Sequence, residues 1–226
     1  PTAVLVAYEE GEMAEVIQEL LREASFLPIP AHDMDEALQR FQEHRPQVVV
    51  VDVALPGAMG FRLCEAIRAD PEAGETKILL VASIYDPTSY KRKPTSLYGA
   101  DDYVEQHHIP DSLIPKIAHL LSGSLYEPRW DCRRQEEEDD LSRVEEVREV
   151  GRRRVSAVGG ERKEEERARR LARIIVADIA LYSEDKIAQG IREGDLLQRL
   201  AEEIAEGWSL FAERIPPSLG TRRAIY

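Results

Sequence analysis

The fold is decided by residues 48–61, which read VVVVDVALPGAMGF. Four consecutive valines are typical of a strand that is buried on both faces, as in the middle of a parallel sheet. The strand ends in a carboxylate, Asp52, and turn-forming residues follow it as far as Gly60. This stretch therefore predicts a central strand that carries one acidic side chain at its carboxyl end.

Strand and helix signals alternate on both sides of this stretch. Apolar runs predict further strands at 3–7, 28–30, 78–81 and 101–104, the second at an edge because it holds two prolines. Helical spacing is found at 11–24, 33–41, 61–69 and 110–121. Alternating strands and helices predict a five-stranded, parallel, doubly wound α/β fold of the flavodoxin-like type.

The carboxyl ends of the strands meet at one edge of such a sheet, where the functional crevice lies. The residues expected at this edge are Tyr8, Glu9, Glu10, Asp52, Ala82, Ser83, Glu105 and Gln106. Glu9 and Glu10 are equally well explained as metal ligands and as a solvated acidic loop. We expect His107 and His108 to lie on an exposed loop, because adjacent histidines rarely chelate one ion.

The composition changes after Ser122. Residues 123–160 predict a linker and a charged helical stalk, and 161–226 predict an all-α module. We expect this module to form a homodimer through its apolar residues, which are Leu171, Ile175, Ile179, Leu200, Ile204 and Trp208. The arginines at 152–154, 167, 169, 170 and 173 alternate with glutamates, which favours exposed i,i+3 and i,i+4 ion pairs. Lys91, Arg92 and Lys93 are interpreted as a solvated face, with a docking patch for a partner as the alternative.

The charge and the cysteines limit the class of partner and the compartment. The net charge is −13, most of it in residues 1–122, and an acidic protein repels nucleic acid and anionic membranes. No apolar run reaches the ~18 residues of a membrane span. Cys64 and Cys132 lie far apart, which favours free thiols in a reducing compartment. We therefore expect a cytoplasmic protein that binds neither nucleic acid nor membrane.

Residues 48–61 resemble the acceptor loop of response-regulator receiver domains, and residues 99–104 (GADDYV) resemble their fifth strand. The resemblance covers about the first 122 residues. It implies that Asp52 is the phosphoacceptor and that Mg²⁺ is held by Glu9, Asp52 and the backbone carbonyl of Ala54. Residues 168–216 are similar to a helical module of multidomain bacterial signalling proteins, which implies an interaction role.

The sequence departs from the receiver pattern at several positions. Tyr8 and Glu9 stand where the family has a pair of acids, and Gln106 stands where it has a lysine. Ala82, followed by Ser83, stands at the threonine or serine of the fourth strand. The switch aromatic of the fifth strand is kept as Tyr103. With the cationic donor and one metal carboxylate missing, phosphorylation is expected to be slow.

Two functions follow from this pattern. The first is a pseudo-receiver, a non-enzymatic signalling protein that acts through protein–protein binding and dimerisation, with Mg²⁺ binding weakened. The alternative is a working two-component response regulator, in which a histidine kinase phosphorylates Asp52 with the help of Mg²⁺. An enzyme of small-molecule turnover is disfavoured, because no nucleophile is paired with a base in the sequence.

Overall fold

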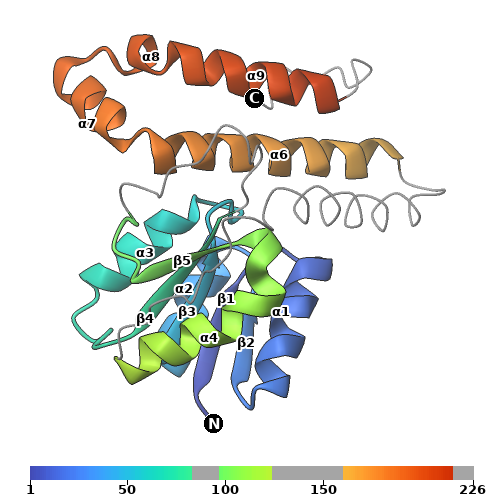
Figure 1. The fold of residues 1–226 in the computed structure, drawn as a ribbon, viewed down its shortest axis with the longest axis vertical. Helices are drawn as coiled ribbons and strands as arrows, with labels where there is room; N and C mark the ends of the chain where they lie inside the picture. The colour runs from blue at the N-terminus through green and yellow to red at the C-terminus, as the bar shows by residue number, and fades with distance from the viewer. Residues whose placement is uncertain (83–96, 124–159, 216–226) are drawn as a thin grey trace, which may run out of the picture.

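The computed structural model describes residues 1–82, 97–123 and 160–215. It confirms the predicted doubly wound α/β fold and the presence of C-terminal helices (Figure 1). The expectations for Ser83, for Lys91 to Lys93, for Cys132 and for the charged stalk lie outside these residues. Within the described ranges, no helix has the length and apolar character needed to cross a bilayer.

Five parallel strands form one sheet in the order β2-β1-β3-β4-β5. Their bounds are β1 Ala3–Ala7, β2 Leu27–Ala31, β3 Val48–Asp52, β4 Lys77–Ala82 and β5 Asp102–Glu105. All five residues of β3 are buried, as its run of valines predicts for the central strand. The proline-containing strand β2 lies at the edge, as expected.

Helices cover both faces of the sheet. They are α1 (Glu12–Glu23), α2 (Met34–His44), α3 (Gly60–Ala69) and α4 (Ile109–Ser122), with a 3₁₀ turn η1 (Gln106–His108) before α4. Asp33 caps α2 by accepting a hydrogen bond from the Glu36 N–H at 2.8 Å. α2 and α3 pack on one face, where Phe41 and Leu63 are buried, and α1 and α4 pack on the other, where Ile17 and Leu113 are buried.

Gly60 lets α3 begin directly against the end of the central strand. A Cβ atom at this position would lie 2.1 Å from the backbone oxygen of Asp52, a distance that no real side chain tolerates. The Gly60 N–H donates to the Val53 carbonyl at 2.9 Å. The glycine therefore holds the Asp52 loop tightly between β3 and α3.

The C-terminal module consists of α6 (Gly160–Tyr182), α7 (Glu184–Glu193), α8 (Leu196–Arg199) and α9 (Ala201–Arg214). α6 lies across the carboxyl edge of the sheet, and α9 runs beside α6 on the side away from the sheet (Figure 1). The helix expected from Leu196 onward is divided at Leu200 into α8 and α9.

The core of this module is formed within one chain. It includes all six residues that the sequence assigned to a dimer contact: Leu171, Ile175, Ile179, Leu200, Ile204 and Trp208. They are buried or partly buried against one another, together with Phe211. Their burial therefore needs no second copy, and dimerisation stays a prediction.

Helix α6 is buried on two faces. Ala168, Ala172, Ile175 and Ile179 belong to the core shared with α9. Ala177 and Leu181 are fully buried in the core of the α/β domain, on the opposite side of the helix. This single helix therefore connects the core of the C-terminal module with the core on the α2 and α3 face of the sheet.

Candidate acceptor site at Asp52

Asp52 lies at the carboxyl end of β3 with its side chain fully buried. Its Oδ1 accepts a hydrogen bond from the Ala54 N–H at 3.0 Å. Burial raises the pKa of Asp52 above its ordinary value, while the positive charge of Arg170 and the hydrogen bond from Ala54 act in the opposite direction. The carboxylate therefore depends on nearby positive charge to stay ionised in a dry position.

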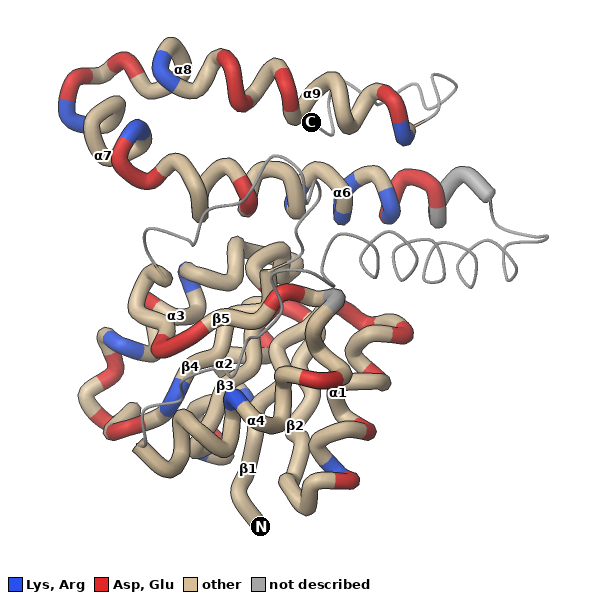
Figure 2. The backbone as a smooth tube through the Cα atoms, in the orientation of Figure 1, with Lys and Arg blue, Asp and Glu red and all other residues tan. Residues whose placement is uncertain are grey.

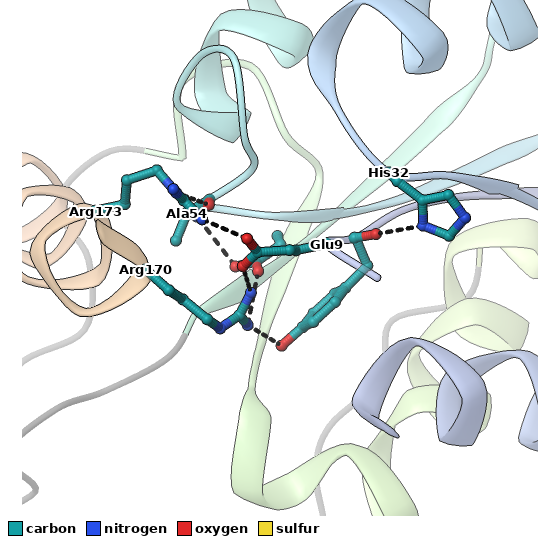
Figure 3. A network of polar contacts seen from close by, with 7 residues as sticks. Glu9, His32, Ala54, Arg170 and Arg173 are labelled. Carbon is teal, nitrogen blue, oxygen red and sulfur yellow. Dashed lines mark hydrogen bonds and ion pairs between the residues drawn. The ribbon is translucent and has the colours of Figure 1, made fainter. Parts of the chain in front are cut away.

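That charge comes from helix α6, more than a hundred residues further along the chain. The Nη2 of Arg170 lies 3.2 Å from Asp52 Oδ2, and its Nη1 donates to Glu9 Oε2 (Figure 3). Burial alone would lower the pKa of Arg170, but the charge of Asp52 and the contacts to Tyr8 and Glu9 raise it above its ordinary value. The guanidinium group is therefore permanently charged at this site.

Arg173, one helical turn further along α6, completes the arrangement. Its Nη2 donates to Glu9 Oε1 at 2.8 Å, and its Nε donates to the carbonyl oxygen of Ala54 at 3.0 Å. Glu9 thus bridges both arginines, one through each carboxylate oxygen (Figure 3). Two guanidinium charges face the two carboxylate charges of Glu9 and Asp52.

Tyr8 forms the aromatic wall of the site. Its side chain is 2% exposed, and the guanidinium carbon of Arg170 lies 5.3 Å from the ring centroid. Arg170 Nη2 also donates to the Tyr8 hydroxyl oxygen at 3.2 Å. The backbone carbonyl of Tyr8 lies 3.3 Å from the His32 ring nitrogen Nδ1 (Figure 3). An aromatic ring at this position attracts a cation through its π face.

The carboxyl-terminal part of α6 is fixed by apolar contacts and one hydrogen bond. The Tyr98 hydroxyl donates to the carbonyl of Ala180 at 2.8 Å, and the Tyr98 ring stacks on Phe61 with centroids 4.7 Å apart. Ala177 and Leu181 are buried in the apolar cluster against which Tyr98 packs. Arg170 and Arg173 share this face of the helix with Ala177 and Leu181, which lie four and eight residues after Arg173.

The expected ion-pair pattern of α6 is correct for one arginine and wrong for two. Arg169 is exposed and pairs with Glu165 at 2.8 Å, an i,i+4 contact. Arg170 and Arg173 instead turn toward the α/β domain, because the stripe that they share with Ala177 faces the sheet. Figure 2 shows basic and acidic positions interspersed along α6. The sequence signal for this orientation was the line of Arg170, Arg173 and Ala177 on one face of the helix.

The other residues expected at the site are placed as follows. Glu10 is exposed, so Glu9 is the acid that approaches Asp52. Ala82 is buried at the end of β4, where it pairs with Glu105 of β5. Tyr103 is partly buried on β5, and Gln106 begins η1. Lys116 pairs with Asp102 at 2.6 Å and lies 5.8 Å from the centre of the Tyr103 ring, so this lysine does not replace the missing donor.

Each residue expected to hold Mg²⁺ accepts a hydrogen bond from an arginine instead. Glu9, Asp52 and the Ala54 carbonyl each accept from Arg170 or Arg173. Mg²⁺ requires near-octahedral oxygen coordination at about 2.0–2.1 Å. The arginine N–H groups occupy the positions beside these oxygens where the ion would have to lie. Over the described ranges, no group of three or more His, Cys, Asp or Glu side chains is gathered as a metal site. With α6 in place, the residues do not fit the metal.

The parallel sheet and the buried aspartate at the end of its central strand agree with the predicted receiver-type fold. The family model for the response regulator receiver domain matches residues 4–118, so the chain belongs to this family. Similar proteins include the probable transcriptional regulator ycf27 of Guillardia theta, 29% identical over 52% of this chain and 44% of that protein. Another is the DNA-binding response regulator MtrA of Mycolicibacterium smegmatis, 31% identical over 55% and 53%.

The chain spans about half the length of the curated relatives that it matches. Among solved structures, the response regulator TrrA of Thermotoga maritima in complex with Mg²⁺-BeF is 26% identical and has a TM-score of 0.46. That match covers 53% of this chain and 99% of TrrA.

Proposed function

We propose that this chain is an atypical response regulator that acts through protein–protein binding and does not switch by phosphorylation of Asp52. The contact between the Arg170 guanidinium and the Asp52 carboxylate carries the proposal. An incoming phosphoryl group carries negative charge and needs access to Asp52 and a divalent cation beside it. Here the access and the cation position are both taken by α6.

The changes at the β5 end and at Tyr8 support the same reading. Gln106 has no charge to offer a phosphoryl oxygen, and a lysine contact of this kind is worth about 1.5–3 kcal/mol. Tyr8 removes one carboxylate from a hard-cation site whose affinity depends on ligand charge. The same tyrosine gives Arg170 a ring to lie on.

We propose a protein partner in place of nucleic acid. Arg170 and Arg173 are partly buried on α6, and both form ion pairs with carboxylates of the same chain. The net charge of −13 opposes contact with a phosphate backbone. Dimerisation through a surface other than the internal core of the C-terminal module remains part of the proposal, and light scattering tests it.

The experiment is treatment of the purified chain with acetyl phosphate and Mg²⁺, read by intact mass. The expected result is no added phosphoryl group on the native chain or on Asp52→Ala. A phosphorylatable receiver treated in the same tube confirms that the reagent is active. Gain of one phosphoryl group by the native chain, absent from Asp52→Ala, would overturn the proposal.

That outcome would favour the second candidate, a regulator phosphorylated by a histidine kinase. The observation in its favour is that Asp52 lies at the carboxyl end of β3, with its Oδ1 accepting from the Ala54 N–H and its Oδ2 accepting from Arg170. In this candidate Glu9, Asp52 and the Ala54 carbonyl would hold Mg²⁺, which supplies the positive charge that the reaction needs. α6 would then have to leave the site.

A further inference from the structure

The acceptor pocket, by which we mean Tyr8, Glu9, Asp52 and the Ala54 carbonyl, has the chemistry of a site for guanidinium groups. Glu9 presents both oxygens to two planar donors, and the Ala54 carbonyl accepts from the Nε of Arg173. Multiple fixed N–H donors of this kind match carboxylate and carbonyl geometry better than a compact ammonium does. Arg170 and Arg173 donate to four such oxygen atoms, which are both carboxylate oxygens of Glu9, Oδ2 of Asp52 and the carbonyl oxygen of Ala54.

The charge of the pocket balances without a metal ion. Glu9 and Asp52 carry two negative charges, and Arg170 and Arg173 carry two positive charges, the same total as one divalent cation. Because Asp52 is fully buried, an unbalanced charge here would be costly. The arginine pair therefore takes over the electrostatic role that a divalent ion has in a receiver with a full set of acids.

Tyr8 independently indicates an organic cation. Its ring lies under the Arg170 guanidinium with 5.3 Å between the ring centroid and the guanidinium carbon. An aromatic face binds a weakly hydrated guanidinium, whereas a hard divalent ion requires oxygen ligands. The pocket has therefore lost a metal ligand and gained an arginine contact at the same residue.

The spacing on α6 defines the ligand. Arg170 and Arg173 are followed on the same helical face by Ala177 and Leu181, which are buried against the α/β domain. The ligand class is thus a helix with two arginines three residues apart and small or apolar residues one and two turns later.

We infer that the acceptor pocket is a guanidinium-binding site, that α6 is its ligand in the same chain, and that α6 and a divalent cation compete for it. The inference deepens the proposed function and rests on it for the absence of phosphoryl switching. Its test measures metal binding, whereas the test of the proposed function measures phosphorylation, so the two can fail separately.

The test is titration of the full chain with Mn²⁺, with free Mn²⁺ followed by electron paramagnetic resonance. If Mn²⁺ binds only when α6 has left the site, and this open state is populated at about 0.1–10%, the apparent Mn²⁺ affinity is weakened by about 10- to 1000-fold. Arg170→Ala/Arg173→Ala should therefore bind Mn²⁺ at least about tenfold more tightly than the native chain. Adding Glu9→Gln to this variant should remove the gain, because Glu9 is one of the competing carboxylates.

Arg169→Ala is the matched control, since Arg169 lies on the same helix, is 60% exposed and pairs with Glu165 of that helix. It should leave Mn²⁺ affinity unchanged. Circular dichroism checks the fold, and if the double alanine variant fails to fold, Arg170→Lys/Arg173→Lys replaces it. The lysine pair keeps the charge but loses the planar donors, and it should also tighten Mn²⁺ binding. Equal Mn²⁺ affinity in the native and the folded variant chains would overturn the inference.

Discussion

Replacement of Arg170 by alanine should release α6 from the acceptor site. Arg170 contacts Asp52, Glu9 and Tyr8, and its side chain is 26% exposed, as is that of Glu9, while Asp52 is 0% exposed. A hydrogen bond to a charged group contributes about 1.5–3 kcal/mol to stability. Because Glu9 is partly exposed, we place the contribution of its contact with Arg170 at the lower end of this range. Glu9 also keeps Arg173 as a partner.

We therefore expect Arg170→Ala to weaken docking of α6 by about 2–3 kcal/mol, which is roughly a 30- to 150-fold change in the docking equilibrium. Native-state hydrogen exchange, read by mass spectrometry over residues 8–12, 52–60 and 168–182, reports the free energy of this opening. Arg169→Ala should change it by less than about 0.5 kcal/mol, as is usual for an exposed substitution.

A double-mutant cycle isolates the contact. Glu9→Gln alone, Arg170→Ala alone and the two together should give a coupling free energy of about 1–2 kcal/mol, within the range found for residues in contact. If exchange in Arg170→Ala matched that in Arg169→Ala, or if the coupling were zero, the arginine contact would not be what holds α6 at the site.

Three further outcomes follow from the same structure. Because the pKa of Asp52 is raised, its contribution favours folding below the ordinary value of 3.8 and is lost as the pH rises through the raised pKa. Urea titrations should therefore show the stability of Asp52→Asn rising relative to that of the native chain as the pH rises from 3.8 through the raised pKa of Asp52. A difference in the free energy of unfolding that did not change with pH would contradict this. Tyr98→Phe removes only the hydroxyl that donates to Ala180, so hydrogen exchange should show α6 docking weakened by about 1 kcal/mol with the fold unchanged. Gly60→Ala would place a Cβ atom 2.1 Å from the Asp52 backbone oxygen, and chemical denaturation should show a loss of about 1–3 kcal/mol; an unchanged midpoint would mean that α3 does not begin where it is placed.

Much of the α/β domain could be predicted from sequence because its signals are local. The valines of β3, the prolines of β2 and the cap at Asp33 each determine structure within a few residues. Since parallel strands end at one edge, Glu9 and Asp52 could be expected to be neighbours. The division between α8 and α9 at Leu200 was missed, because the apolar spacing continues across it.

The arginines were missed because their partners are remote. Arg170 is 118 residues from Asp52, and an arginine among glutamates predicts local ion pairs equally well. The distinguishing signal was the two-faced pattern of α6. Ala168, Ala172 and Ile175 supply one face, and a second stripe of Ala177 and Leu181 continues the line of the arginines. Glu9 and Asp52 at the sheet edge, with Gln106 in place of a lysine, were interpreted only as a weakened phosphorylation site, although two acids side by side also favour a cation between them.

In this structure the positive charge beside Asp52 comes from an arginine of the same chain. The most direct measurement is a crystal structure of the full chain grown in magnesium-containing solution. We expect the Arg170 guanidinium to contact Asp52 and Glu9, with Arg173 on the Ala54 carbonyl and no magnesium ion between them. Magnesium bound to Glu9, Asp52 and the Ala54 carbonyl, with α6 displaced, would contradict it.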